Sequence, residues 1–444
     1  MRNDFPKQVQ IVIIGGGIMG CSTAYHLMKN GCKDVVLLER AKLTSGTTWH
    51  SAAQVRQLRS TESLTKLVQN SVKLYSSLED ETGQATGWQQ SGSLSIATNS
   101  DRLTHIRRQV SLSKAFGIGA EEISVKEASE KWPLMRTNDL IGAVYSPSDG
   151  RVGPSDICAA LIKGAKSKGL QVYEDTRVAG IRTKNGRVSA VQTEQGEITC
   201  ETVVNCAGIW GRSIAAMVGV TAPLHACEHF YLLTELMDSI TSPLPTLSDH
   251  DGHIYLRDEG GGLLVGCFEP KGKALDLEQL PENFVFDLLP EDWDHIEPII
   301  INAIHRIPEL EQTGVKMLIN GPESFTPDDR FLLGESPELR GFFLGCGMCS
   351  VGIASGGGAG QALAEWIMDG EPSMDLWSVD IRRFVPAQNT LRTLRERSPE
   401  TLSLHYAVSF PGRQHQSSRN LRLSPLHSRL ESAGAEFAER MGWE

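Results

Sequence analysis

The sequence contains no long apolar run and no cluster of basic residues. No apolar stretch approaches the roughly 20 residues that a helix needs to span a bilayer, and the formal net charge is -11. Such a charge repels nucleic acid phosphates and anionic lipid, and no run of five or more basic residues counters it. We therefore expect neither nucleic acid nor a membrane as a partner.

Cysteine spacing typical of a disulfide framework is also absent. The nine cysteines are an odd, scattered set, which suits a reducing cytoplasm. Cys346 and Cys349 form one Cys-x-x-Cys motif, but no second pair or histidine cluster accompanies it. We favour small turn-lining residues over a redox or zinc site at this motif, and we predict no metal.

The size and composition indicate a globular protein with two lobes. A chain of 444 residues is longer than one hydrophobic core usually supports, and 40% hydrophobic with 22% charged residues is an ordinary balance. Because the glycine motif described next starts at residue 15, a cleavable signal is not expected in front of it.

The first forty residues carry a complete nucleotide-binding pattern. Val9–Ile14 is almost wholly apolar, as a strand buried on both faces of a parallel sheet requires. Gly15, Gly17 and Gly20 follow, and Ser22–Met28 continues as a helix. The first glycine permits a tight turn, the second lets the backbone approach a pyrophosphate, and the third lets helix and strand pack closely.

A second strand and an acid complete this pattern. Val35–Leu38 is a short apolar run that ends at Glu39, where a carboxylate accepts hydrogen bonds from ribose hydroxyls. Strand, turn, helix and acid together predict a bound dinucleotide. At this point either FAD or NAD satisfies the pattern.

The next segment favours FAD. The polar loop Leu43–Ser51 contains Thr48-Trp49-His50 and resembles the flavin-attachment segment of the dimethylglycine and sarcosine dehydrogenases. In that family the histidine after Thr-Trp bonds covalently to the flavin 8α-methyl carbon, and His50 falls on its position. A tether would retain the cofactor and make the flavin a stronger oxidant. The alternative is an ordinary hydrogen-bonding loop histidine.

The resemblance extends over nearly the whole chain. It continues through residues 58–60, 132–135, 155–156 and 203–210, the last being a strand that runs into Ala207-Gly208. It implies that FAD contacts the following residues: Gly15, Gly17, Ile18, Met19, Gly20, Glu39, Arg40, Gly46, Thr47, Thr48, Trp49, His50, Val178, Ala207, Gly208, Trp210, Gly352, Ile353 and Gly357.

A second glycine-rich segment lies near residue 350. Residues 341–345 are expected to form a buried strand, followed by Gly352, the glycine run 355–360 and a helix over Gln361–Met368. The N-terminus of this helix would suit negative charge on a reduced flavin. Residues 346–350 depart from the relatives, which usually carry an aromatic residue or Asn there. The sequence therefore does not tell which side chain lines this edge of the flavin.

The expected fold is α/β, with a Rossmann-like FAD-binding domain and an α+β second lobe. Strand-like alternation at residues 92–97, 229–233, 253–256 and 262–266 predicts an antiparallel sheet over the flavin. We assign 1–90, 151–224 and 331–372 to a discontinuous FAD-binding domain, and 91–150 with 225–330 to the substrate domain. Residues 373–444 form a C-terminal extension.

The family resemblance implies oxidation of an N-methyl amine. His229 and Tyr255 lie in substrate-facing segments and would orient or deprotonate the amine, while Arg59 and Arg257 would hold a carboxylate. A tyrosine in a strand is otherwise usually core, and an arginine after a strand is usually a surface charge. The loop 320–330 also resembles a family loop at the cofactor, without an assignable role.

The implied reaction yields the demethylated amine and formaldehyde by hydride transfer to flavin N5. An electron-transfer flavoprotein or oxygen would then accept the electrons. Two alternatives remain: a flavin-binding regulatory subunit without turnover, as one relative of this superfamily is, and an oxidoreductase for another secondary amine or a 2-hydroxy acid. Residues 421–437 resemble the lead-in to a folate-binding domain of longer relatives, which suggests a separate folate-dependent subunit as partner.

Overall fold

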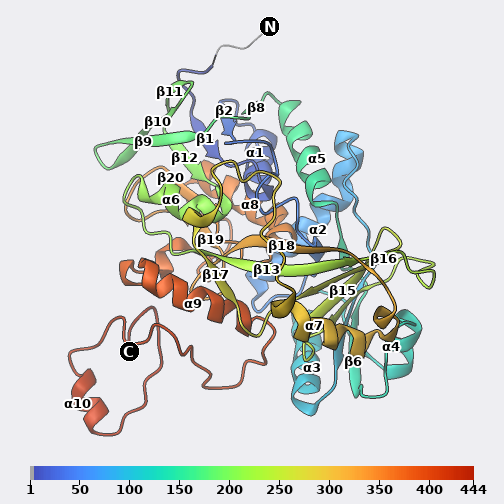
Figure 1. Cartoon of the computed structure of the whole chain (residues 1–444). Coiled ribbons are helices and arrows are strands. Elements are labelled where there is room, and N and C mark those ends of the chain that lie inside the picture. Colours follow the sequence, from blue (N-terminus) through green and yellow to red (C-terminus); the bar gives the residue numbers. More distant parts are fainter. Residues whose placement is uncertain (1–4) are drawn as a thin grey trace.

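The computed structural model describes residues 5–444, and a six-stranded sheet forms the half that is predicted to bind a dinucleotide (Figure 1). The strand order is β19-β20-β12-β1-β2-β8. All neighbours are parallel except β19, which is antiparallel to β20. The strands are β1 (Ile11–Ile14), β2 (Val35–Leu38), β8 (Gln171–Tyr173), β12 (Thr202–Asn205), β19 (Leu332–Glu335) and β20 (Phe342–Cys346).

Helices cover one face of this sheet and a small sheet covers the other. The helices are α1 (Ile18–Lys29), α2 (Glu62–Thr82), α5 (Pro154–Lys166) and α8 (Gly352–Asp369), which share one hydrophobic core. The opposite face packs against α6 (Gly211–Ala216) and a three-stranded antiparallel sheet. Its strands are β9 (Val178–Lys184), β10 (Arg187–Thr193) and β11 (Gly196–Thr199).

Helix α8 corrects one prediction. The helix begins at Gly352, so the glycine run lies inside it and does not form a turn before Gln361. An added Cβ at Gly358 would lie 2.7 Å from the Leu67 carbonyl carbon on α2, and one at Gly360 would lie 2.6 Å from Ser22 Cβ on α1. These glycines therefore allow α8 to pack closely against two helices at once.

The second lobe is built around a nine-stranded, largely antiparallel sheet. Its strand order is β17-β13-β16-β15-β14-β4-β6-β5, with β18 paired to β13. The predicted strands at 92–97, 229–233, 253–256 and 262–266 are confirmed within it. The strands are β4 (Ser93–Ala97), β5 (Glu121–Ile123), β6 (Gly142–Ser146), β13 (His225–Thr234), β14 (Thr246–Asp249), β15 (Ile254–Glu259), β16 (Gly262–Cys267), β17 (Lys273–Leu275) and β18 (Val315–Phe325).

The remaining elements are a small ribbon and three helices. Strands β3 (Gln54–Val55) and β7 (Gly150–Arg151) pair in an antiparallel two-stranded ribbon. The helices α3 (Ser100–Ala115), α4 (Val125–Lys131) and α7 (Trp293–Arg306) lie around the second sheet (Figure 1). Among residues 5–444, no helix is both long and apolar enough to cross a membrane.

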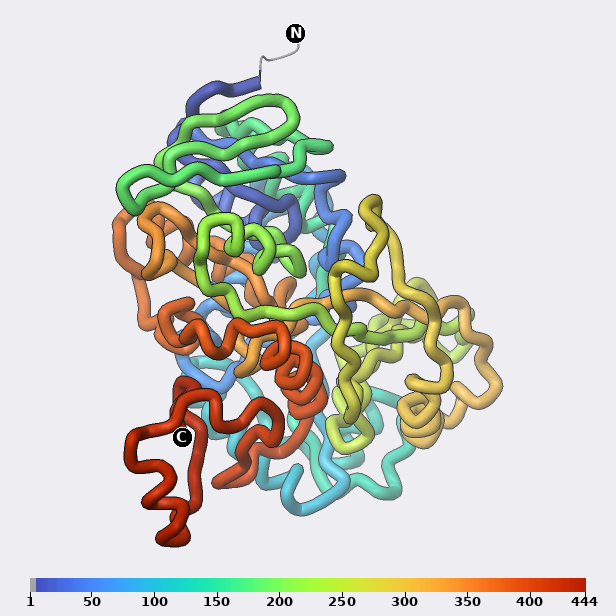
Figure 2. Tube along the Cα trace, turned by 60° about the vertical axis from the view of Figure 1, so that its left-hand side comes forward, coloured from blue at the N-terminus to red at the C-terminus, as the bar shows by residue number. Residues whose placement is uncertain are grey.

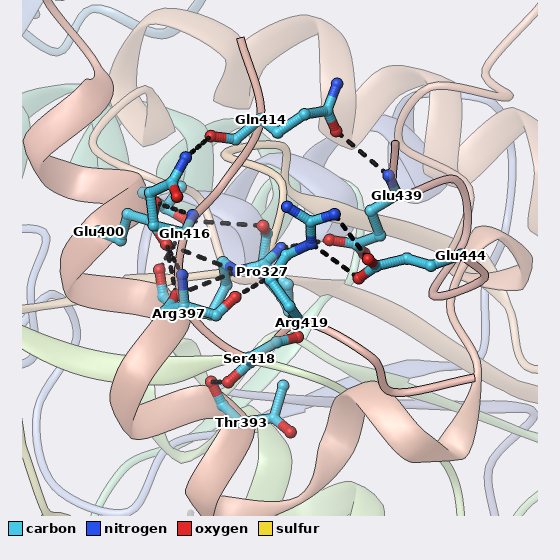
Figure 3. Close-up of polar contacts among 12 residues, drawn as sticks. Pro327, Thr393, Arg397, Glu400, Gln414, Gln416, Ser418, Arg419, Glu439 and Glu444 are labelled. Carbon is cyan, nitrogen blue, oxygen red and sulfur yellow. Dashed lines mark hydrogen bonds and ion pairs between the residues drawn. The ribbon is translucent and has the colours of Figure 1, made fainter. Parts of the chain in front are cut away.

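The C-terminal segment returns to the body of the protein and then projects from it (Figure 2). Helix α9 (Leu391–Leu404) contacts β13, β17 and β18, whereas α10 (His427–Ser432) lies in the projecting loop. Buried Arg397 on α9 donates to Glu439 Oε2 at 2.8 Å and to the Ser417 carbonyl at 2.6 Å (Figure 3). Arg397 thus links Ser417 and Glu439 of the C-terminal segment to α9.

Candidate active site

A cleft opens where the parallel strands of the six-stranded sheet end. Its lining includes Ile14, Leu38, Cys206 and Cys346, which stand at or just after the carboxyl ends of β1, β2, β12 and β20. Ligands of open α/β sheets bind in this position, where the direction of strand order changes. The N-termini of α1 and α8 also reach the cleft, because Ile18 and Ile353 line it.

The glycine motif brings backbone rather than side chains to this cleft. Gly15 has a φ of +108°, and an added Cβ would lie 2.8 Å from the Cys206 carbonyl carbon. Glu39 is buried, and its Oε2 accepts a hydrogen bond from the Gly16 amide at 2.7 Å. Burial raises the pKa of Glu39, although amide donors oppose the shift. The acid therefore fixes the glycine loop as well as lining the cleft.

A loop of the second lobe also lines this cleft. The Arg40 guanidinium lies over the Trp210 ring at 4.7 Å and donates to the Glu282 carbonyl. Phe284 also lines the cleft, and the Phe286 amide donates to the Ser45 carbonyl at 3.0 Å. Both lobes thus contribute walls to the first cavity.

A second cavity adjoins the first, and four residues line both. These shared residues are Ser51, Glu323, Ser350 and Ile353. The second cavity extends from this junction between the sheet of the second lobe and the loop that follows β3. A cleft for the predicted cofactor that meets a second cavity is the arrangement expected of a flavin enzyme with a small substrate.

His50 stands beside the junction. Its imidazole is buried, and its Nε2 has no hydrogen-bond partner within residues 5–444. Burial lowers the pKa of His50 to about 4, and the charge of His229 acts in the same direction. Gly321 on β18 leaves room for the ring, since an added Cβ there would lie 2.5 Å from His50 Nδ1. The imidazole is therefore neutral and its lone pair is available.

His229 on β13 is protonated, whereas His50 is neutral. Its Nδ1 lies 3.0 Å from Oε2 of buried Glu269, while its Nε2 has no partner in the described part of the chain. Burial lowers the pKa of His229, but the Glu269 carboxylate outweighs it and raises the pKa to about 9. His229 lines the second cavity, so it presents an imidazolium N–H donor to a ligand. This charge suits anion binding better than the predicted deprotonation of an amine.

Arg59 and Tyr255 line the same cavity, whereas Arg257 does not. The Nε of Arg59 is buried without a hydrogen-bond partner in the described chain. Burial lowers the pKa of Arg59 to about 10, which still leaves the group cationic at neutral pH. Arg257 instead donates to the Ala52 carbonyl at 2.9 Å and pairs with Glu259. Its predicted role as a carboxylate anchor is not supported by this placement.

The C-terminal segment supplies a wall of the second cavity that the sequence did not predict. His405 and Tyr406 both line it. The His405 ring stacks on Phe268 with centroids 4.0 Å apart, and His405 Nδ1 lies 2.7 Å from Asp329 Oδ2. Arg102 donates to the Tyr406 carbonyl at 2.8 Å. Contacts with Phe268, Asp329 and Arg102 thus hold the residues just after α9 at the wall of the second cavity.

Most residues expected to contact the cofactor line the first cavity. These are Gly15, Gly17, Ile18, Met19, Glu39, Arg40, Gly46, Thr47, Thr48, Val178, Ala207, Gly208, Trp210, Gly352 and Ile353. Gly20 and Gly357 are packing glycines instead: an added Cβ at Gly20 would overlap the Gly15 carbonyl, and one at Gly357 would lie 2.8 Å from Ser71 Cα. Trp49 packs edge-on against His50 and Phe286.

Comparison with known proteins identifies the family. Residues 10–366 match the family model described as FAD dependent oxidoreductase, and residues 369–424 match that of an FAD dependent oxidoreductase central domain. This chain belongs to the FAD-dependent oxidoreductase family. The predicted cofactor FAD and the predicted fold class are thereby confirmed, and the expected resemblance to sarcosine and dimethylglycine dehydrogenases is confirmed as well.

Several relatives of this FAD-dependent oxidoreductase align over nearly its whole length. Mitochondrial sarcosine dehydrogenase of Mus musculus is 45% identical over 99% of this chain and 48% of the relative. The mitochondrial pyruvate dehydrogenase phosphatase regulatory subunit of Mus musculus is 42% identical over 99% and 50%. The formaldehyde-forming 4-methylaminobutanoate oxidase of Paenarthrobacter nicotinovorans is 38% identical over 100% and 54%. The chain therefore spans about half the length of these curated relatives.

A solved structure supports the same architecture. L-proline dehydrogenase from P. horikoshii superimposes with a TM-score of 0.76 at 26% sequence identity, covering 85% of this chain and 98% of that one. The FAD-dependent oxidoreductase fold thus accounts for most of the residues up to α8, and the C-terminal wall lies in the segment matched by the second family model.

The residues present fit FAD. In the first cavity, a side chain at Gly15 would clash with the neighbouring backbone, so only glycine leaves room for the dinucleotide there. Glu39 stands where an acid binds the ribose hydroxyls, and two helix N-termini can face the phosphates and the flavin. Next to this cavity stands His50, whose buried Nε2 has no partner among residues 5–444. Gly15, Gly17, Glu39 and Arg40 would hold the dinucleotide, and His50 would face the flavin end.

Proposed function

We propose that this FAD-dependent oxidoreductase demethylates an N-methyl amino acid of the sarcosine or dimethylglycine type. The observation that carries the proposal is the second cavity, which meets the cofactor cleft and offers the unpartnered donors of Arg59 and His229. Two cationic donors that line one cavity would bind the carboxylate and leave the N-methyl group for the flavin.

FAD, when bound, supplies the two-electron acceptor for a hydride from the N-methyl carbon. The chain's own residues bind and orient the substrate. Arg59 and His229 hold the carboxylate, and the buried Tyr255 phenol, whose pKa burial raises well above its ordinary value, remains a neutral hydrogen-bond donor. The iminium product would hydrolyse to the demethylated amine and formaldehyde. An electron-transfer flavoprotein or oxygen would take up the electrons.

We further propose that His50 is the covalent attachment site. A neutral imidazole with a free Nε2 is the form that can act as a nucleophile. Denaturing gels of wild type and His50→Ala provide the test. Yellow flavin fluorescence should stay with the wild-type polypeptide and vanish in the variant; release of all FAD from denatured wild type would reduce His50 to a loop residue.

The same site is compatible with two alternatives. A flavin-binding regulatory subunit is favoured by the 42% identity to the phosphatase regulatory subunit, and another amine or a 2-hydroxy acid is the other possible ligand. A separate folate-dependent subunit stays a prediction, and so does the compartment. Nine free cysteines suit a reducing compartment, whereas the names of the two mouse relatives place those proteins in mitochondria.

Anaerobic reduction of the flavin by a substrate panel tests the proposal. Sarcosine or N,N-dimethylglycine should bleach the flavin absorbance, whereas glycolate should not. Bleaching by glycolate alone would show that the substrate is a 2-hydroxy acid. Bleaching by proline alone would show that it is another secondary amine. A flavin that no member of a broad amine panel reduces would support the regulatory reading.

A further inference from the structure

Glu323 is a buried carboxylate at the junction of the two cavities. It stands on β18, is 9% exposed, and lines both the cofactor cleft and the second cavity. Its Oε2 atom has no hydrogen-bond partner, and it takes part in no ion pair within residues 5–444. A buried acid without a partner is costly, so a group that completes it is expected from a ligand.

The surroundings do not supply a spare cation for Glu323. The nearby imidazolium of His229 is already paired with Glu269 at 3.0 Å. The titratable groups that sense the Glu323 charge are Cys227, His229 and Tyr231 on β13 and Tyr255 on β15. Apart from His229, these groups are thiols or phenols, which carry no positive charge. The His229 charge is thus shared between Glu269 and Glu323, and none of the other three groups balances the Glu323 carboxylate.

The strand that carries Glu323 is fixed against the cofactor side of the junction. Glu323 lies opposite Cys227 in the register of β18 and β13. Two residues earlier, Gly321 contacts the His50 ring, and the Thr47 hydroxyl donates to the Pro322 carbonyl at 2.9 Å. The same short segment therefore contacts the proposed attachment histidine and places the carboxylate where the chambers meet.

We propose that Glu323 binds the ammonium group of the substrate and accepts its proton before oxidation. An N-methyl amino acid is a zwitterion at neutral pH, and the cavity offers a matching pair of charges: Arg59 and His229 for the carboxylate, and Glu323 for the nitrogen. This inference rests on the proposed function for its substrate class. It gives the loop 320–330 the role that its sequence did not reveal.

The proton transfer is balanced without any further reagent. The ammonium N–H bond breaks, an O–H bond forms on Glu323, and the nitrogen keeps the electron pair. The neutral amine then has the lone pair that it needs to stabilise the iminium when the N-methyl carbon loses a hydride. The oxidant for that later step is the FAD of the proposed function.

Ligand binding to the holoenzyme tests the ammonium site independently of turnover. Trimethylglycine carries a permanent cation, and 3,3-dimethylbutanoate has the same shape and carboxylate with carbon in place of nitrogen. Wild type should bind trimethylglycine more tightly by flavin difference spectra. Glu323→Gln should weaken trimethylglycine binding at least tenfold and change 3,3-dimethylbutanoate binding by less than about threefold. Glu323→Asp should restore part of the preference, and Glu371→Gln, at an exposed position, should behave as wild type.

The pH dependence of flavin reduction tests the proton transfer. Glu323→Gln must take its substrate as free amine, so its reduction rate at low substrate should rise tenfold per pH unit between about pH 6 and 8. Wild type should change much less over this range. Equal pH profiles, or equal losses of affinity for both ligands, would overturn the proposal. If no N-methyl amine reduces wild type, the proposed function fails, while the ligand pair still decides whether Glu323 is a cation site.

Discussion

The imidazole of His50 occupies the space that a side chain at position 321 would need. An added Cβ on Gly321 would lie 2.5 Å from His50 Nδ1 and 3.0 Å from Nε2. A glycine 271 positions away in the sequence is thus part of the environment of the proposed attachment site. The dependence of His50 on this glycine can be measured.

Gly321→Ala should therefore reduce covalent flavin without unfolding the protein. The methyl group displaces the ring, so most of the flavin fluorescence of the denatured polypeptide should be lost. Gly119→Ala is the matched control, because nothing lies within 4 Å of an added Cβ there. Covalent flavin at the wild-type level in Gly321→Ala would mean that His50 does not need this space for attachment.

Glu269→Gln should make substrate binding sensitive to pH in the neutral range. The carboxylate outweighs burial and holds the His229 pKa at about 9, so wild type should lose carboxylate affinity only as the pH rises through about 9. Without the charge, burial lowers the pKa of His229, and a fall of about two pKa units should raise KM at pH 8 about tenfold. A KM profile unchanged from pH 6 to 9 would show that His229 does not bind substrate as a cation.

The same pair has a predictable effect on stability. The folded pKa of His229 lies above the usual value near 6.5. Its contribution to the free energy of unfolding is therefore fully present below about pH 6.5 and is lost as the pH rises through about 9. Urea unfolding of wild type and Glu269→Gln should differ most at the acid end of this range, and a constant difference across it would contradict the ion pair.

Tyr406→Ala should widen substrate choice. Tyr406 is part of the wall that the C-terminal segment adds to the second cavity, and its ring packs 4.1 Å from His250 and 4.6 Å from Phe268. Removing the ring should raise KM for sarcosine about tenfold and improve kcat/KM for amines with longer N-alkyl groups. Phe410→Ala is the control, because Phe410 is 55% exposed. Parallel changes for short and long amines would show a general loss of structure.

Gly358→Ala should destabilise the helical layer and leave the chemistry of the site intact. Its Cβ would press on the Leu67 backbone of α2, and overpacking of this kind costs about 1–3 kcal/mol. Thermal unfolding should report a lower Tm, while Met368→Ala at an exposed position of the same helix should change little. An unchanged Tm would show that α8 can move away from α2 without cost.

The sequence predicted the elements whose signals are local. The strand, glycine turn, helix and acid at residues 11–39 follow from short-range pattern alone, and so do most strands of the second sheet. The glycine run of α8 was misread because glycine is usually a helix breaker. Its role in helix packing depends on α1 and α2, which lie about 300 residues earlier.

The candidate site was predicted less completely because its contacts are long-range. His229, Tyr255 and Arg59 line the second cavity, but Arg257, two residues beyond Tyr255 on the same strand face, pairs with Glu259 and the Ala52 carbonyl instead. Tyr406 comes from a tail with no sequence signal of its own. Glu323 stood in a recognised motif, yet only the fold reveals that its carboxylate is buried and unpartnered.

A single anaerobic turnover of the flavin-loaded protein with sarcosine, followed by assay of formaldehyde, tests the proposed demethylation directly. About one formaldehyde should be released for each flavin reduced, and neither reduction nor formaldehyde should be seen when glycine, which has no N-methyl group, replaces sarcosine. Flavin reduction without formaldehyde, or equal reduction by glycine, would contradict the assignment of the N-methyl carbon as the hydride donor.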